Sequence, residues 1–402
     1  QVEKTEKTNL FLHYKYMRSR GGSVVKEANI HPPPQEINWN ILYKVARQNC
    51  FSAMLYPLLK ENLQLPQPVL NAFLRDYQLY VAKDLTQQFE LQKILDFCEQ
   101  EAVLNLPLKG CVLKRFYPQP YMRFMGDIDL WTDTSGVKKL RDFLVQCGYT
   151  LVSRTGIHDE YEKPPHMAVE IHKKLVIDEN RAASFFNVKI PQRLTRTHGR
   201  KYSCAMAPKD FYLHLLDHTA KHFYGTGITP RMILDFYMLD KMQGIPHGEE
   251  LEVSLKRLHF QTFAQRLTML AHDWFSPEGA GLAKDYFSLY IIQNGSFGRR
   301  RNAYFAKTAR ETKEEKPPSK VGYVLRRLFP TYTMLKGKFP VLEKAPVLTP
   351  FMYLPWWATW FDTLFIHRRL DYRSLKYIND ISGESTEQMR ALYKEMELDY
   401  RR

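Results

Sequence analysis

Cysteine is scarce in this sequence and is not arranged in pairs. The 402 residues include five cysteines that stand far apart with no Cys-x-x-Cys motif, namely Cys50, Cys98, Cys111, Cys147 and Cys204. This spacing excludes the disulfide framework of a small secreted domain and a cysteine-based zinc knuckle. No signal-peptide pattern opens the sequence. We therefore expect reduced thiols and a cytoplasmic location.

Long hydrophobic runs are also missing. The segment to consider is the aromatic stretch at 351–361. Pro350, Pro355 and Asp362 interrupt it, and it falls short of the roughly 20 apolar residues needed to cross a bilayer, so we expect no transmembrane segment. Three interpretations of this stretch stay open. It stacks on nucleic-acid bases beside neighbouring arginines, it contacts a membrane peripherally, or it packs the end of a helical domain.

Negative charge is in the minority. The chain carries 58 lysines and arginines against 43 aspartates and glutamates, which gives a formal net charge of +15. A basic chain attracts polyanions, so nucleoside triphosphates, nucleic acid and anionic membrane surfaces are candidate partners. With 44% hydrophobic and 13% aromatic residues, the composition is that of a globular protein with a sizeable core.

Shifts in composition divide the chain into five segments. Helical patterns flank a compact alternation of strands and helices, and the two outermost segments are basic. The segments are 1–38 (a weakly ordered lead-in), 39–102 (helical), 103–204 (strands and helices), 205–298 (helical) and 299–402 (a basic and aromatic extension).

The first helical segment carries apolar residues at helical spacing. Between Trp39 and Glu101 this pattern predicts three or four helices. Leu79, Leu85 and Phe89 belong to the recurring apolar set and are expected to face the core. We interpret the segment as a packing scaffold.

The middle segment reads as strands and helices in alternation. We expect a strand at 103–108, a Lys109-Gly110 turn, and a strand that contains Asp127 and Asp129. The other expected elements are a helix from Val112 to Tyr117, a helix from Gly136 to Cys147, a strand at 148–152, a loop with His158 and His166, and a strand from Ala168 to His172.

Two of these strands carry acidic residues at alternate positions. In Asp127-Ile128-Asp129-Leu130 the two carboxylates project from one face, because successive strand side chains point to opposite faces. Glu170 and His172 repeat this arrangement in the second strand, so a third carboxylate can join the first two. Three carboxylates on one patch repel each other unless a cation neutralises them, and Mg²⁺ prefers such oxygen ligands.

The Lys109-Gly110 turn and Arg123 are candidates for anion binding. Glycine lets a phosphate approach the backbone at a helix start, and Lys109 adds a positive charge there. Arg123 lies four residues before Asp127, where it either contacts the developing phosphate charge or pairs with an acid.

The helices after Pro208 carry further polar candidates. His214, His218 and His222 recur every four residues and so share one helix face, with cleft lining, helix packing and a transition-metal site as open interpretations. In the next helix Arg231 and Asp235 are expected to pair with each other. A third helical region is expected from Leu251 to Phe275.

Four sequence blocks carry a family resemblance: Leu108-Lys109-Gly110, Arg123-x-x-Gly126-Asp127-Ile128-Asp129-Leu130, Val169-Glu170-Ile171-His172 and Leu213-x-x-Leu216-x-His218-x-x-x-His222. Together they resemble a little-characterised bacterial nucleotidyltransferase-like family of the polymerase-beta superfamily. The resemblance covers roughly residues 40–300, and the Arg-x-x-Gly-Asp-Ile-Asp-Leu block is its most specific part.

The resemblance implies an α+β fold in which a small polymerase-beta-like core, a mixed sheet with helices, is embedded between helical regions. It implies that Asp127, Asp129 and Glu170 bind Mg²⁺ or Mn²⁺ and are catalytic. The residues expected at the nucleotide are Lys109, Gly110, Arg123 and His172. The implied reaction moves a nucleoside monophosphate from an NTP such as ATP to a hydroxyl or phosphate of a small molecule, tRNA or protein, by two-metal catalysis.

The sequence departs from the family pattern in one respect that bears on activity. Cys111 follows Gly110 where many superfamily members have serine or glycine. The alternative is therefore a catalytically inactive nucleotide- or RNA-binding module on the same fold.

Overall fold

The computed structural model describes residues 38–62, 64–177, 182–276, 279, 285–294, 328–339, 341–365 and 383–398. The chain forms two compact units. The first comprises residues 1–223, 227–298 and 394–402, and the second comprises 224–226 and 299–393. The predicted lead-in, residues 1–38, lies outside the described residues except for Asn38.

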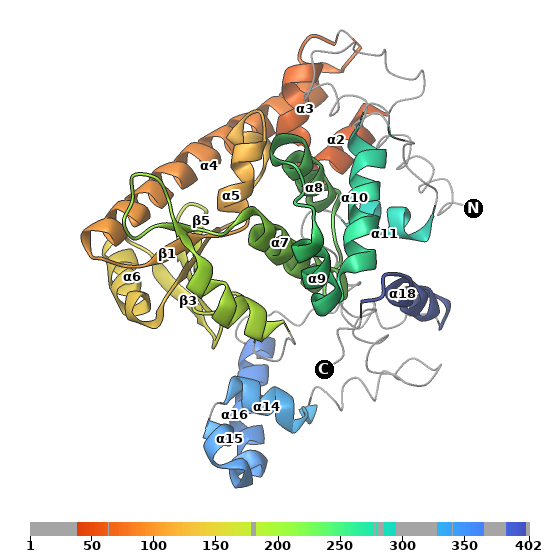
Figure 1. Ribbon diagram of the computed structural model, residues 1–402. Helices are drawn as coiled ribbons and strands as arrows, with labels where there is room; N and C mark the ends of the chain where they lie inside the picture. The colour runs from red at the N-terminus through yellow and green to blue at the C-terminus, as the bar shows by residue number, and fades with distance from the viewer. Residues whose placement is uncertain are drawn as a thin grey trace. The chain divides into compact units, whose positions relative to one another are not determined.

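Three helices open the first unit, as the sequence predicts: α2 (Trp39–Gln48), α3 (Ser52–Leu59) and α4 (Gln67–Gln100). Asn38 caps α2, because its side chain accepts hydrogen bonds from the backbone N–H groups of Asn40 and Ile41. At about 1.5 Å per residue, the 34 residues of α4 span roughly 50 Å. In Figure 1 this helix runs from α3 toward the sheet and α6 (Thr134–Gln146).

Only part of the apolar pattern of α4 faces the core, where Ile94 and Cys98 are buried as predicted. Leu79, Leu85 and Phe89 are 63%, 60% and 68% exposed, so their expected place in the core is wrong. The face toward the sheet instead buries Asp84, Gln87 and Glu90. Polar residues occupy this face because they meet lysine side chains and backbone carbonyls there.

The first unit contains a mixed five-stranded sheet, which confirms the predicted α+β class. Its strands are β1 (Asn105–Pro107), β2 (Ile128–Thr132), β3 (Thr150–Arg154), β4 (His158–Lys163) and β5 (Met167–His172). The spatial order is β1-β2-β5-β4-β3, with β2 and β5 parallel and the other neighbours antiparallel. The pair of predicted acidic strands therefore lies side by side near the centre of the sheet.

Strand β4 is absent from the sequence prediction, which places His158 in a loop. Its sequence, His-Asp-Glu-Tyr-Glu-Lys, is too polar for a strong strand signal and is followed by two prolines. Asp159 and Tyr161 are nonetheless buried, and their alternation is the period of a strand with one covered face. The error matters because it moves His158 from a loop onto the sheet.

Helices α4 and α6 cover one face of the sheet. Helix α6 (Thr134–Gln146) follows β2, close to its predicted bounds, and Asp133 caps it by accepting a hydrogen bond from the Gly136 N–H at 2.9 Å. The core on this face joins residues of α4, α6 and the central strands: Ile94, Cys98, Leu140, Leu144, Ile128, Leu130, Val169 and Ile171. The opposite face of β2 and β5 stays available for polar side chains.

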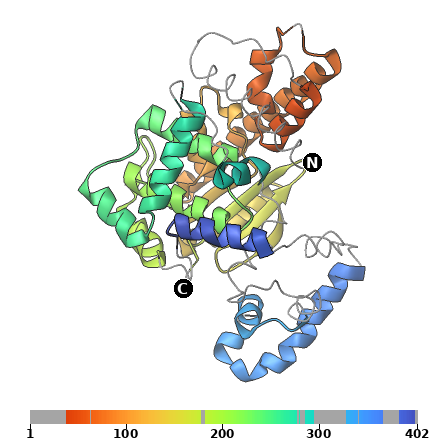
Figure 2. The same cartoon turned by 90° about the vertical axis from the view of Figure 1, so that its right-hand side faces the viewer.

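The remaining helices of the first unit gather on the other side of the sheet, as both ribbon views show (Figure 1 and Figure 2). They are α7 (Pro208–Tyr224), α8 (Pro230–Gln243), α9 (Glu249–Leu258), α10 (Gln261–Phe275) and α11 (Tyr286–Asn294). The predicted third helix, 251–275, is thus two helices. It breaks at His259, whose φ of 56° lies in the left-handed region that ends helices.

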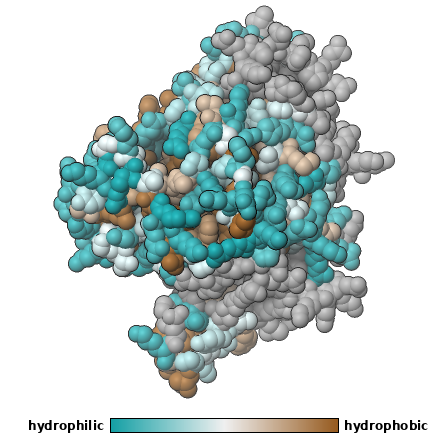
Figure 3. Space-filling view, viewed as in Figure 1, coloured by the Kyte–Doolittle hydropathy of each residue, from teal (hydrophilic) through white to brown (hydrophobic). Residues whose placement is uncertain are grey.

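The second unit contains α14 (Tyr332–Lys338), α15 (Val341–Lys344) and α16 (Thr349–Phe365), and α18 (Gly383–Glu395) follows. The aromatic stretch lies in α16, where the indole N–H of Trp357 donates to the Leu328 carbonyl at 2.7 Å. Phe351 and Leu354 of the same helix are 62% and 64% exposed. The described helices include none with the length and apolarity to cross a membrane. The face of the protein seen in Figure 3 is mainly hydrophilic, with small apolar areas among the polar side chains.

Candidate active site

Three carboxylates converge at the open face of β2 and β5. The parallel pairing puts Asp129 opposite Glu170, and Asp127 lies immediately before β2. The intervening Ile128 and Leu130 are fully buried on the opposite face, as the alternation predicts. One carboxylate oxygen each from Asp127, Asp129 and Glu170 lies within 4.8 Å of the others.

Asp129 is the most deeply buried of the three carboxylates, and neighbouring side chains already stabilise its ionised form. Its Oδ1 accepts a hydrogen bond from Lys109 Nζ at 2.6 Å and contacts His172 Nε2 at 2.8 Å. Burial opposes ionisation, but Lys109 and His172 outweigh it and hold the pKa of Asp129 well below its usual value. The same imidazole nitrogen lies 3.2 Å from Glu170 Oε2, so His172 bridges two of the carboxylates.

Asp127 lacks this compensation. Within the described part of the chain, no side chain donates a hydrogen bond to it. Burial, Asp129 and Glu170 together raise its pKa to about 6. A divalent cation would relieve this repulsion, and three carboxylates are the oxygen donors that Mg²⁺ and Mn²⁺ take. The residues present therefore fit a hard cation.

A cavity of about 360 Å³ lies in front of the carboxylates. Its sheet wall carries Asp127, Asp129 and Glu170, and its helical wall carries residues of α7 and α8. The polar residues of that helical wall include His214, Asp217, His218, Lys221, His222 and Arg231.

Arg123 pairs with an acid, which is one of its two predicted roles. Its Nη2 lies 2.8 Å from Asp235 Oδ2 and its Nε lies 3.1 Å from Asp235 Oδ1. Tyr117 also donates to Asp235, at 2.7 Å. The predicted pairing of Arg231 with Asp235 is wrong, because Arg123 takes both oxygens and Arg231 donates to the Phe124 carbonyl. The Arg123 side chain still borders the cavity.

Other side chains pack tightly against the Lys109-Gly110 turn, where the sequence predicts that a phosphate approaches the backbone. A Cβ on Gly110 would come within 2.7 Å of Met125 Sδ and 2.9 Å of Arg123 Nη1, so glycine lets these side chains close over the turn. Helix α5 (Gly110–Leu113) is one turn long, and 114–116 continues as a 3₁₀ turn, in place of the predicted helix from Val112 to Tyr117.

Cys111 lies behind the site. Its Sγ is 3.7 Å from the Asp129 carbonyl oxygen, and the side chain packs against the sheet core. Burial raises the pKa of the thiol to about 12, so it stays protonated at neutral pH.

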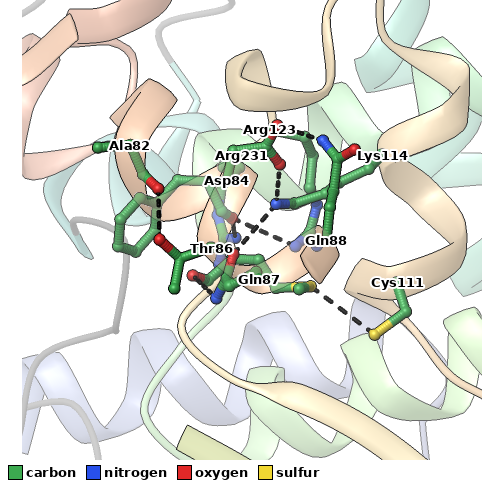
Figure 4. Close-up of polar contacts among 11 residues, drawn as sticks. Ala82, Asp84, Thr86, Gln87, Gln88, Cys111, Lys114, Arg123 and Arg231 are labelled. Carbon is green, nitrogen blue, oxygen red and sulfur yellow. Dashed lines mark hydrogen bonds and ion pairs between the residues drawn. The ribbon is translucent and has the colours of Figure 1, made fainter. Parts of the chain in front are cut away.

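Helix α4 holds the turn that leads into Asp127, a role that sequence reasoning missed. Gln87 donates to the Met125 carbonyl at 3.0 Å, and Lys83 donates to the Gly126 carbonyl at 3.1 Å. Lys114 joins the network through an ion pair with Asp84 and a 3.1 Å hydrogen bond to Gln87 (Figure 4). Polar residues in a helix usually indicate a solvated face, so the sequence offered no signal for these contacts.

The three histidines of α7 line the cavity, which was one of their open interpretations. Burial, followed by the positive charge of Lys109, lowers the pKa of His214 to about 3. Burial likewise lowers the pKa of His218 and His222, so all three rings are neutral at pH 7. The groups of side chains placed to hold a metal, among the described residues, do not include them.

Comparison with known families agrees with this geometry. A family model described as an uncharacterised nucleotidyltransferase matches residues 35–276, which include the sheet and both walls of the cavity. The chain therefore belongs to this nucleotidyltransferase family. Comparisons with curated proteins and with solved structures find no match.

Proposed function

We propose that the protein moves a nucleoside monophosphate from an NTP to a hydroxyl or phosphate oxygen of an acceptor and releases pyrophosphate. One observation carries this proposal. Asp127, Asp129 and Glu170 converge at the wall of one cavity, and no side chain of the described residues donates a hydrogen bond to Asp127. Divalent Mg²⁺ or Mn²⁺ is the cation that this donor set selects.

The bound metal would supply positive charge for the reacting phosphate and would ease removal of a proton from the acceptor hydroxyl. Asp127 and Asp129 hold the metal, and Glu170 also accepts that proton. His172 acts as a positioning residue, because its contacts to Asp129 and Glu170 keep the two carboxylates in place. Proton transfer to Glu170 requires that the acceptor hydroxyl lie within hydrogen-bond distance, and Glu170 borders the cavity where the acceptor would bind.

The triphosphate is proposed to lie along the cationic residues that border the cavity. Lys109 and Gly110 lie beside Asp129, and Arg123 lies deeper, where Asp235 fixes its guanidinium. Arg231 adds a second guanidinium from α8, with its carboxylate neighbour already taken by Arg123. Charge-assisted hydrogen bonds from arginine suit phosphate oxygens.

A transfer assay tests this function. The full chain is incubated with α-labelled NTP, Mg²⁺ and a cell extract, and the RNA, protein and small-molecule fractions are counted. We expect one fraction to become labelled with wild-type protein and the label to fall at least a thousandfold in Asp127→Asn. Asp142→Asn is the matched control, since Asp142 is an exposed carboxylate on α6. Binding of NTP and Mg²⁺ without labelling would instead support an inactive binding module.

A further inference from the structure

A second group of metal-ligand side chains lies beside the acidic cluster. His158 on β4 pairs directly with His172 on β5 in the antiparallel register, so both rings stand on the same face of the sheet. Their ring centroids are 5.4 Å apart. Glu170, two residues before His172, projects from that face as well, and one ligand atom from each of the three lies within 4.8 Å of the others.

The donor set differs in kind from the neighbouring carboxylates. Two imidazoles and one carboxylate suit borderline ions such as Zn²⁺ and Co²⁺, whereas the all-oxygen cluster suits Mg²⁺. With metal–ligand bonds of about 2.1 Å, tetrahedral ligand atoms lie about 3.4 Å apart. The three side chains rotate from these positions to bring their ligand atoms onto one ion.

His172 has an unused nitrogen. Its side chain is only 8% exposed, and its Nδ1 has no hydrogen-bond partner among the described residues. In the neutral ring, when Nε2–H donates to Asp129, Nδ1 carries a free lone pair. A metal-binding histidine commonly uses one nitrogen for the ion and donates the other N–H to a carboxylate.

We propose that His158, Glu170 and His172 form a binding site for one divalent transition-metal ion of the Zn²⁺ class. Glu170 is common to this site and to the acidic cluster, whereas Asp127 belongs only to the latter. Three protein ligands leave one position for water or a substrate oxygen. All three ligands border the cavity, so the ion has access to what binds there.

Zinc binding to the metal-free full chain tests the site. The chain is stripped with a chelator and titrated with Zn²⁺ in excess Mg²⁺ and without nucleotide, so the result does not depend on nucleotidyl transfer. We expect one Zn²⁺ per chain, and at least tenfold weaker binding in His158→Ala. His166→Ala is the matched control, because His166 is exposed in the turn between the same two strands. Asp127→Asn should retain the zinc.

The imidazole NMR signals provide a second measurement that needs no variant to fold. Addition of Zn²⁺ to the wild-type chain should shift the ring nitrogen signals of His158 and His172 and leave that of His166 unchanged. The proposal is overturned if those two signals do not shift, if His158→Ala binds zinc like wild type, or if Asp127→Asn loses zinc as strongly as His158→Ala does.

Discussion

Asp127 is the residue whose surroundings most clearly require a cation. It lies beside two other carboxylates, partly buried, and its pKa is raised to about 6 by burial and by those neighbours. A carboxyl group with a raised pKa destabilises the folded state as pH rises through that range, because the unfolded chain ionises more easily. In the metal-free protein the full cost is therefore present at pH 7.

Asp127→Asn should consequently stabilise the metal-free protein while it removes transfer activity. We expect the free energy of unfolding at pH 7 in a chelator to rise by about 2–3 kcal/mol. Urea unfolding of the variant and the wild type measures the difference, and the gain should disappear at pH 3.5, where the carboxyl is protonated. A variant less stable than wild type in the chelator would contradict this account of Asp127.

The stability of the folded protein should also depend on pH through His214. Its side chain is 3% exposed, and burial lowers its pKa to about 3, compared with about 6.5 in an unfolded chain. The unfolded state therefore binds a proton first, and stability falls as pH drops below 6.5. By pH 5 this one residue should cost about 2 kcal/mol.

His214→Gln isolates this effect. Between pH 7.5 and 5, the variant should lose about 2 kcal/mol less unfolding free energy than wild type does, as measured by chemical denaturation. His198→Gln, at an exposed histidine, should behave like wild type. Equal pH dependence in the His214 variant and the wild type would show that the ring is not held neutral.

At the scale of elements, α4 supports the turn that leads into the cluster of three carboxylates. Gln87 is 1% exposed, donates to the Met125 carbonyl and accepts from Lys114. Gln87→Ala leaves the Met125 carbonyl without this donor and removes one of the two partners of Lys114, and it should cost about 1–3 kcal/mol of stability. It should also raise the Mg²⁺ concentration needed for half-maximal transfer, because the turn before Asp127 loses its support.

The control for this prediction is Gln92→Ala on the same helix. Gln92 is exposed and bonds only to Asp96 on the surface, so its loss should change stability by less than about 0.5 kcal/mol. Identical behaviour of the two glutamine variants would argue against α4 as the support of the turn.

The two acidic strands could be predicted because alternation in a strand is local. The placement of Asp127 and Asp129 opposite Ile128 and Leu130 needs only the period of the strand. The partners of these residues could not be predicted in the same way. Asp235, which fixes Arg123, is 112 residues away in sequence and belongs to a helix whose own spacing suggested Arg231 as the partner. Which distant residues pair depends on how the chain packs, and a local sequence pattern does not hold that information.

In helix α4 and strand β4, the sequence pattern does not predict which polar residues are buried. Apolar spacing placed Phe89 in the core, yet Glu90 is buried there by Tyr149 and Lys163. Strand β4 is too polar to be predicted as a strand, although its pairing with β5 gives His158 its position. Such buried polar contacts depend on how the whole unit packs, and they produce no periodic pattern in the sequence.

At the scale of the molecule, the core of the sheet is completed by α4, which precedes the sheet in the chain. Ile94 and Cys98 of α4 pack against the strands, and Glu90 pairs with Lys163 of β4 at 2.8 Å. A fragment of residues 103–204 would expose this apolar surface, so we expect it to lack a cooperative thermal transition by circular dichroism. The full chain should show one. A cooperative transition in the fragment would show that the sheet and α6 suffice for folding.

The identity of the transferred group tests the central claim most directly. The purified chain, Mg²⁺ and a responsive acceptor fraction are incubated with NTP labelled at either the α- or the γ-phosphate, and acceptor and pyrophosphate are separated and counted. The account predicts that the α label stays on the acceptor, that the γ label leaves in pyrophosphate, and that both vanish in Asp127→Asn. Retention of the γ label on the acceptor, or transfer that persists in Asp127→Asn, would contradict nucleotidyl transfer at these carboxylates.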